Sequence, residues 1–185
     1  MATVDDFRFR VLSHATSLKS FRNSWPAWSP LIKQAIGSPA DENLIYNLGS
    51  QLKTIFRANV VTGRSNKAVS TGGTAWESLI CWYLNLVFYG TNVVVIKPIK
   101  KFTPPTIFDS LTINIANQPT NSESDLLAFN IPILGANSKY KLKDIDAGIK
   151  NNVLSTDLTV IQLKTNWNDN AQIPMLWDLI YSSTS

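Results

Sequence analysis

The segment from Thr74 to Tyr89, TAWESLICWYLNLVFY, most constrains how this chain can fold. It has the length of a helix and is apolar almost all round, so it must be covered on several sides inside the protein. Its apolar run, residues 79–89, is too short to span a bilayer, and it contains Asn85. The segment therefore predicts a central, buried helix that does not cross a membrane, and Gly90 marks its end.

The composition narrows the chemistry that the chain can perform. Of its 185 residues 44% are hydrophobic, which is enough for one sizeable core. The one cysteine, Cys81, lies in the apolar segment and predicts a buried thiol, which suits a reducing cytoplasm. The N-terminus lacks the apolar stretch of a signal peptide, so we expect a cytoplasmic protein. With His14 as the one histidine, zinc sites and Cys–His or Ser–His catalysis are poorly supported.

Helical signals dominate residues 1–60. In the clearest case, SPADENLIYNLGSQLKTIFRANVV, Ser38 is a suitable N-cap, Pro39 suits the first helical position, and apolar residues recur at helical spacing. The preceding SWPAWSP, residues 24–30, is typical of a turn-rich connector, and residues 61–73 are typical of a polar loop. We therefore expect a helical N-terminal region that covers residues 1–70.

Strand signals replace the helical ones after residue 90. NVVVIKP, SLTINIANQ, DLLAFNIP and DLTVIQLK predict short strands, and PTNSES between two of them is turn-like. Residues 139–152 predict either a short helix or an irregular segment, and AQIPMLWDLIYSS predicts a final helix. The sequence thus predicts an α/β (α+β) fold, in which residues 71–185 form a central mixed β-sheet flanked by helices. We expect this core and the N-terminal region to form one compact domain.

The last predicted strand ends in Gln162 and Lys164, which lie two residues apart and therefore point to the same face. A carboxylate from a neighbouring strand would complete a cluster of acid, amide and ammonium. Carboxylate and amide oxygens suit Mg²⁺, which activates water and offsets phosphate charge, and a lysine can position the water or stabilise the oxyanion. This combination of groups suits metal-assisted phosphodiester hydrolysis.

Three places in the sequence offer the missing carboxylate. Asp125 opens the strand DLLAF after a turn-like stretch, so a neighbouring or antiparallel pairing would bring it beside Gln162. Asp157 is nearer in sequence, but along one extended strand it lies about 17 Å from Gln162. Asp144 and Asp146 come third. The strand geometry favours Asp125.

An Asp that opens one strand, followed by (D/E)-x-K on the next, resembles the PD-(D/E)xK nuclease superfamily, which includes most type II restriction endonucleases. The matching residues are Ser124-Asp125-Leu126 and Gln162-Leu163-Lys164. TGGTAWESLICWYLNL also looks like the helix before the sheet in those enzymes, where a glutamate often supports the metal site; this role carries over to Glu77. The resemblance covers about residues 71–182 and implies a restriction-endonuclease-like core.

The resemblance implies a Mg²⁺-dependent endonuclease of type II restriction-enzyme type, which hydrolyses phosphodiester bonds of double-stranded DNA at a specific sequence. Asp125 and Gln162 would hold the metal, Lys164 would assist the water or the transition state, and Glu77 would support them from the helix. Enzymes of this type are often dimers, so the resemblance also suggests a homodimer.

Departures from the family pattern support a second interpretation. Ser124 stands where the pattern has proline, and Gln162 stands where it has an acid. An amide is a weaker metal ligand than a carboxylate. The family core also usually has a further strand after its last helix, and the sequence stops at Ser185 before one. The alternative is therefore a catalytically degenerate or truncated nuclease-fold protein that acts as a DNA-binding or assembly module.

Residues suited to DNA contact occur before the central helix and after the last strand. Arg64 and Lys67 flank glycines before the helix and suit phosphates, in a chain of formal net charge +4. The loop KTNWNDNAQ offers amides that can read adenine edges or contact phosphates. These amides belong to Asn166, Asn168, Asn170 and Gln172. A second basic group consists of Lys97, Lys100 and Lys101.

Each of these residues also has an ordinary structural interpretation. Thr74 and Glu77 match a capping box, S/T-x-x-E, in which the glutamate reaches back to the cap. Asp125 is also typical of the end of a turn, and Lys164 of a solvated strand end. The basic groups are typical of a solvated surface, and the amide-rich loop of a cap for the last helix.

Overall fold

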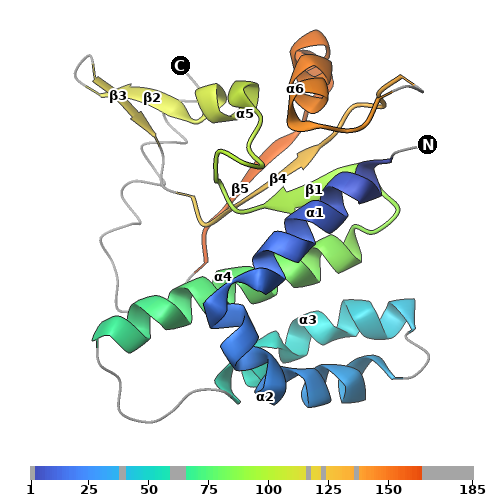
Figure 1. The fold of residues 1–185 in the computed structure, drawn as a ribbon, viewed down its shortest axis with the longest axis vertical. Helices are drawn as coiled ribbons and strands as arrows, with labels where there is room; N and C mark the ends of the chain where they lie inside the picture. The colour runs from blue at the N-terminus through green and yellow to red at the C-terminus, as the bar shows by residue number, and fades with distance from the viewer. Residues whose placement is uncertain are drawn as a thin grey trace.

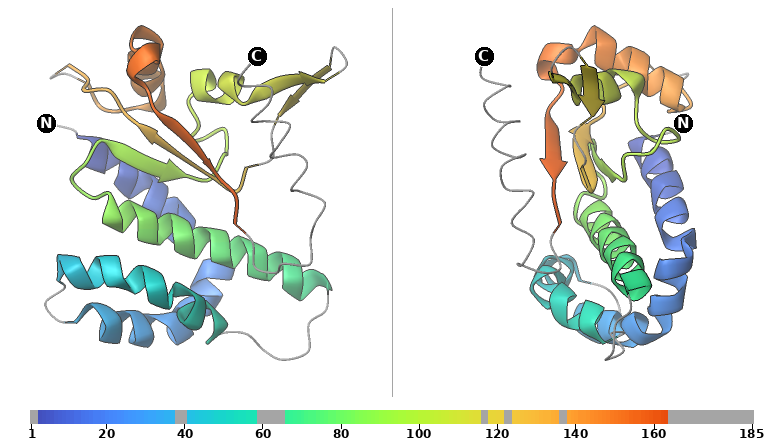
Figure 2. Two further views of the ribbon diagram at one scale, coloured as in Figure 1. Left: turned by 180° about the vertical axis from the view of Figure 1, so that it is seen from behind. Right: turned by 90° about the vertical axis from the view of Figure 1, so that its left-hand side faces the viewer.

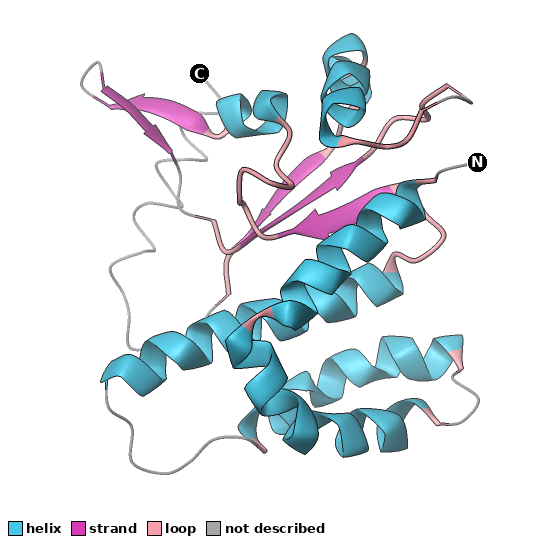
Figure 3. Cartoon of the chain, in the orientation of Figure 1, coloured by secondary structure: helices cyan, strands magenta, loops and turns pink. Residues whose placement is uncertain are grey.

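The computed structural model describes residues 3–37, 41–58, 66–115, 118–121, 124–135 and 138–163. In these residues helices pack against one small β-sheet, which confirms the mixed α/β class (Figure 1). The larger helices are α1 (Val4–Ser17), α2 (Lys19–Ile36), α3 (Glu42–Arg57) and α4 (Asn66–Val87). Two shorter helices are α5 (Pro105–Ser110) and α6 (Leu142–Asn151). Figure 3 shows α2 and α3 at one end of the molecule and α5 and α6 at the other.

The sheet consists of three strands in the order β1-β4-β5. They are β1 (Val93–Ile96), β4 (Leu126–Asn130) and β5 (Leu158–Ile161). Both pairings are antiparallel, so the expected mixed sheet is wrong for the part of the chain that the structure describes. The strands β2 (Thr112–Ile115) and β3 (Gln118–Asn121) form a separate antiparallel hairpin. The start of PTNSES, expected as a turn, therefore belongs to a strand.

The central helix that the sequence predicts is α4, and it is longer than expected. It begins at Asn66, so the predicted loop over residues 61–73 is wrong from residue 66 onward. It ends before Gly90, whose φ of +77° favours glycine. Leu79 and Cys81 are fully buried, which confirms the buried thiol. Figure 2 shows α4 between the sheet and the α2–α3 pair, and α4 contacts α1, α2, α3 and β1.

The helical start of the chain forms as expected, but the cap of α3 differs from the prediction. Asp41, rather than Ser38, is its N-cap. The Asp41 carboxylate accepts hydrogen bonds from the backbone N–H groups of Asn43 at 2.7 Å and Leu44 at 3.3 Å. Among the described residues no helix is both long and apolar enough to cross a membrane.

The segment expected as a connector, residues 24–30, lies inside α2. Pro26 and Pro30 each lack a backbone N–H and ordinarily interrupt a helix. Both prolines are exposed, whereas Trp28 between them is fully buried and meets the ring of Phe21 at a centroid distance of 5.6 Å. Burial of one indole contributes about 4–6 kcal/mol, which offsets the cost of the prolines.

Side chains from α1 and α4 cover the outer edge of β1. The Arg8 Nη2 donates hydrogen bonds to the carbonyls of Thr91 at 2.8 Å and Val93 at 2.7 Å. The Asn85 Nδ2 donates to the Val95 carbonyl at 2.6 Å, and its Oδ1 accepts from the Val95 N–H at 3.2 Å. These contacts satisfy backbone groups that an edge strand otherwise leaves open.

Asp146 of α6 holds α5 in place. Its Oδ1 accepts a hydrogen bond from the Thr106 N–H at 2.8 Å, and its Oδ2 lies 3.1 Å from the Lys150 Nζ. Burial raises the pKa of the Asp146 carboxyl, but the hydrogen bonds from Thr106 and the charge of Lys150 outweigh it, so the pKa is lowered.

The segment 139–152, for which the sequence left a helix and an irregular structure open, contains the helix α6, which the 3-10 turn η1 (Val153–Ser155) follows. The predicted helix AQIPMLWDLIYSS lies outside the described residues.

Candidate active site

Asp125 lies at the start of β4, against the end of β5. Its Oδ2 accepts a hydrogen bond from the Leu163 N–H at 2.6 Å. In the antiparallel register Leu126 pairs with Ile161, so the next position outward on one side is Asp125 and on the other side is Gln162. The structure therefore brings Asp125 and the segment that begins at Gln162 together.

The apolar residues of β4 hold Asp125 in position. Leu126 and Leu127 follow it directly and are fully buried, which fixes the start of the strand in the core. Asp125 itself is half-buried, as are Gln162 and Leu163. An ionised carboxylate offers about four acceptor positions, and the Leu163 N–H occupies one. The carboxylate can thus serve the sheet and a cation at the same time.

The other candidate acids lie elsewhere. Asp157 precedes β5 at the end away from Gln162, and it is exposed. Asp144 accepts a hydrogen bond from the backbone N–H of Lys141 at 3.3 Å, at the start of α6. Asp146 holds α5, as described above. The position of Asp125 beside the end of β5 is therefore not shared by these three carboxylates.

Glu77 does not cap α4, and its expected support of the metal site stays a prediction. Thr74 lies inside α4, so the expected capping box at Thr74 is wrong. The Glu77 carboxylate instead forms an ion pair with Lys97, whose Nζ lies 2.6 Å from Oε2. Both side chains are largely shielded from solvent, with exposed fractions of 24% and 17%. This pair ties α4 to the residue that follows β1.

The candidate site has one described carboxylate, that of Asp125, rather than a cluster of acids. Among the described residues no three His, Cys, Asp or Glu side chains come together to hold a metal ion. Mg²⁺ usually keeps several waters and binds through few carboxylates together with substrate phosphates. The register places Asp125 opposite Gln162, whose side chain carries an amide oxygen, and a Mg²⁺ site between them stays a prediction.

Most of the expected DNA contacts cannot be placed. Arg64 and the amide-rich loop lie outside the described residues, as does Lys164, which was predicted to assist catalysis. The loop residues concerned are Asn166, Asn168, Asn170 and Gln172. Lys67 lies near the start of α4, so its segment is helical rather than the expected loop. Their contacts with DNA stay predictions.

Asn85 is a structural residue that the sequence indicated only indirectly. It is fully buried, and besides Val95 its Nδ2 donates to the Cys81 carbonyl at 2.9 Å. The Cys81 Sγ lies 3.5 Å from the Val95 carbonyl. Burial raises the pKa of the Cys81 thiol to about 12, which keeps it protonated and unreactive. A lone amide in an otherwise apolar helix was the available signal, because buried polar groups are hydrogen-bonded.

No protein-family model matches the chain, and no curated protein or solved structure is significantly similar to it.

Proposed function

We propose that the chain is a Mg²⁺-dependent endonuclease that cleaves double-stranded DNA in the manner of type II restriction enzymes. The observation that carries the proposal is the hydrogen bond from the Leu163 N–H to Asp125, at 2.6 Å. It brings an acid at the start of one strand beside the end of the next, where Gln162 and Lys164 stand in the sequence. The order of a buried helix, β1, β4 and β5 is compatible with the restriction-endonuclease-like core that the resemblance implies.

Each residue has a role in this proposal. The Asp125 carboxylate and the Gln162 amide oxygen would hold Mg²⁺, which supplies an activated water and offsets charge on the scissile phosphate. Lys164 would position that water or stabilise the charge that develops on the phosphate oxygens. Glu77 would support the site through Lys97, its ion-pair partner, rather than through the metal.

The test is cleavage of plasmid DNA with and without Mg²⁺ by Asp125→Asn, Lys164→Ala and the control Asp157→Asn. Asparagine keeps an oxygen that can accept from the Leu163 N–H, so the Asp125 variant should keep its melting temperature and lose at least about 100-fold in rate. Asp157 precedes β5, at the opposite end of the β4–β5 pair from Asp125, and is exposed, so its variant should cleave normally. Unchanged cleavage by both active-site variants would refute the assignment.

Gln162 favours the alternative of a nuclease-fold protein that binds DNA without cutting it. It stands where the family pattern has an acid, and Asp125 already has a structural role through Leu163. Gln162→Glu separates the two functions, because it restores the missing carboxylate next to Asp125. A variant that gains Mg²⁺-dependent cleavage over an inactive parent identifies a degenerate site. The homodimer, the cytoplasmic location and the sequence specificity stay predictions.

A further inference from the structure

Five exposed basic side chains gather around two adjoining recesses of the surface. They come from α1, from the loop between β1 and α5, and from the turn that opens α6. We call this group the basic surface; its members are Arg10, Lys101, Lys139, Lys141 and Lys143.

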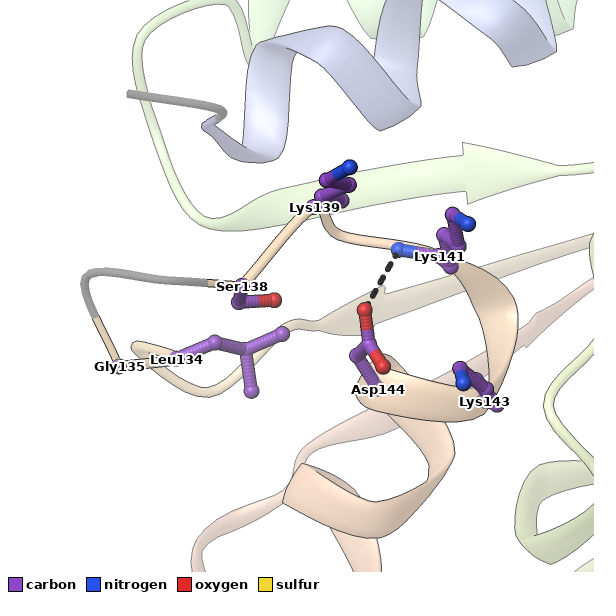
Figure 4. A pocket seen from close by; sticks show the side chains of 7 residues that line it. All are labelled: Leu134, Gly135, Ser138, Lys139, Lys141, Lys143 and Asp144. Carbon is purple, nitrogen blue, oxygen red and sulfur yellow. Dashed lines mark hydrogen bonds between the residues drawn. The ribbon is translucent and has the colours of Figure 1, made fainter.

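The two recesses share part of their lining. The first has a volume of about 430 Å³ and is lined by Lys139, Lys141 and Lys143, together with Ser138 and Asp144 (Figure 4). The second, of about 400 Å³, is lined by Arg10 and Lys101 and again by Lys139 and Lys141. Because Lys139 and Lys141 line both, the recesses form one continuous positively charged surface rather than two separate sites.

The charge of the basic surface is not compensated by neighbouring acids. None of the ion pairs found among the described residues involves its five members, whereas Lys97 and Lys150 are both paired. Asp144 is the one acidic residue that lines either recess. Its Oδ2 accepts from the backbone N–H of Lys141, as the dashed line in Figure 4 shows. Five cations therefore face one carboxylate.

Two of the five cations, Arg10 and Lys101, are held in position by contacts with buried residues. Arg10 lies over the ring of Phe7, 5.5 Å from its centroid, and donates a hydrogen bond to the Tyr140 carbonyl. Lys101 lies over the ring of Phe102, 5.3 Å from its centroid. These contacts reduce the freedom that the side chains would lose when they bind an anion.

The pKa of His14 responds to the charge of Lys101, a member of the basic surface. Its ring packs against Phe102 at a centroid distance of 5.4 Å. Burial lowers the pKa of His14, and the charges of Lys101 and Lys97 lower it further. Of the basic surface, Lys101 thus contributes to the lowered pKa of His14, after the larger effect of burial; Lys97 lies outside this surface and is paired with Glu77.

We infer that the basic surface binds the phosphate backbone of double-stranded DNA without regard to base sequence. The inference deepens the proposed function and rests on it for the choice of DNA as the polyanion. Lysines dominate the surface, and lysine binds phosphate as a point charge, whereas base reading favours planar side chains. Contacts of this kind fix the position of a duplex and supply affinity.

The aromatic residues beside the cations favour a duplex over a single strand. Proteins that bind single strands stack bases on accessible aromatic rings. Phe7 and Phe102 line the second recess, but they are only 1% and 4% exposed. Tyr140, next to both lysines of the shared lining, is 7% exposed. The residues that line the two recesses therefore offer charge to a backbone and no accessible aromatic ring to a base.

Three members of the basic surface lie away from the candidate active site along the sheet, whereas Lys101 follows the end of β1 that pairs with the start of β4. Asp125 precedes β4, whereas Lys139, Lys141 and Lys143 follow the strand's other end through the loop to α6 (Figure 1). Five strand residues span about 17 Å. A duplex bound at these three lysines would therefore make phosphate contacts separate from those at the scissile bond.

The test is a fluorescence anisotropy titration of a labelled 20-base-pair duplex in EDTA, at several salt concentrations. The variant K139A/K141A/K143A should bind the duplex roughly 10- to 500-fold more weakly at about 0.1 M salt. The reason is that each phosphate contact contributes about 0.9 to the slope of log K against log salt, and the variant loses up to three such contacts. The slope itself should fall by about 2–3 units. The pair K139Q/K143Q, which leaves the start of α6 intact, should show about two thirds of that change.

The matched control is K19A/K33A/K53A, which removes the same charge from exposed positions on α2 and α3. It should keep the slope of the parent. Equal losses in both triple variants would reduce the effect to net charge and overturn the inference, as would an absence of duplex binding by the parent.

Two further arms separate this inference from its competitors. Vesicles with an anionic phospholipid replace the duplex in one arm, and lysine-dependent binding to vesicles but not to DNA would overturn the inference in favour of a membrane surface.

Cleavage with Mg²⁺ is measured separately. A parent that binds through these lysines but does not cut would refute the proposed function alone, and cleavage with unchanged binding of K139A/K141A/K143A would refute the inference alone.

Discussion

The Asn85 amide offers a direct test of how the sheet is held against α4. Replacement by leucine keeps a similar volume but removes the group that pairs with both backbone atoms of Val95. Each buried backbone group left without a partner costs about 1–3 kcal/mol, hence about 2–6 kcal/mol for two. The extra apolar surface of leucine returns about 1–2 kcal/mol. We expect Asn85→Leu to lower the free energy of unfolding by about 1–4 kcal/mol.

Urea denaturation followed by tryptophan fluorescence measures this loss, and hydrogen exchange at the Val95 amide localises it. Asn47→Leu is the control, because it makes the same chemical change at an exposed position of α3 and should alter stability by less than about 0.5 kcal/mol. If Asn85→Leu matches this control, and the Val95 amide exchanges no faster, the reasoning that Asn85 completes the edge of β1 is refuted.

Three further predictions concern helices and charges. Pro26→Ala should stabilise the fold by up to about 3 kcal/mol in urea, because it restores a donor inside α2; a loss would mean that α2 needs the proline. The lowered pKa of His14 means that the unfolded state binds protons more readily, so stability should fall as pH drops below 6.5. Melting at pH 7.5 and 5 should show a smaller difference for His14→Gln. Asp146→Asn should cost about 1.5–3 kcal/mol near neutral pH, and this cost should shrink as the pH falls from 3.8 through the lower pKa that the carboxyl has in the folded parent; a cost that does not change with pH would exclude a charge effect.

Local sequence patterns predicted helices and strands correctly where tertiary packing favours the same structure. They predicted them wrongly where tertiary packing favours a different one. The all-apolar helix and the runs that became β1, β4 and β5 were predicted because their burial leaves few alternatives. The connector at residues 24–30 was wrong because the burial of Trp28 outweighs two exposed prolines. The capping box at Thr74 was wrong because α4 continues to Asn66, and propensity yields to such tertiary context.

At the candidate site, the distance argument that preferred Asp125 to Asp157 agrees with the register, since these residues lie at opposite ends of the β4–β5 pair. The partner of Glu77 could not be predicted, because Lys97 lies 20 positions further along the chain and nothing local links the two. The basic surface was likewise not predictable as a unit. Its members come from three separate segments, and only Lys101 belonged to a basic group that the sequence indicated.

Side chains already cover the outer edge of β1, which limits where a further strand can join the sheet. Arg8 and Asn85 already occupy the outward carbonyls and N–H groups of that strand, so β1 cannot accept another strand without losing them. Within the part of the chain that the structure describes, the other edge of the sheet is β5, so an added strand, from the same chain or from a second copy, would pair there. Because β5 leads into Gln162, a strand added at this edge would lie beside the carboxylate of Asp125, where we propose that DNA is cleaved.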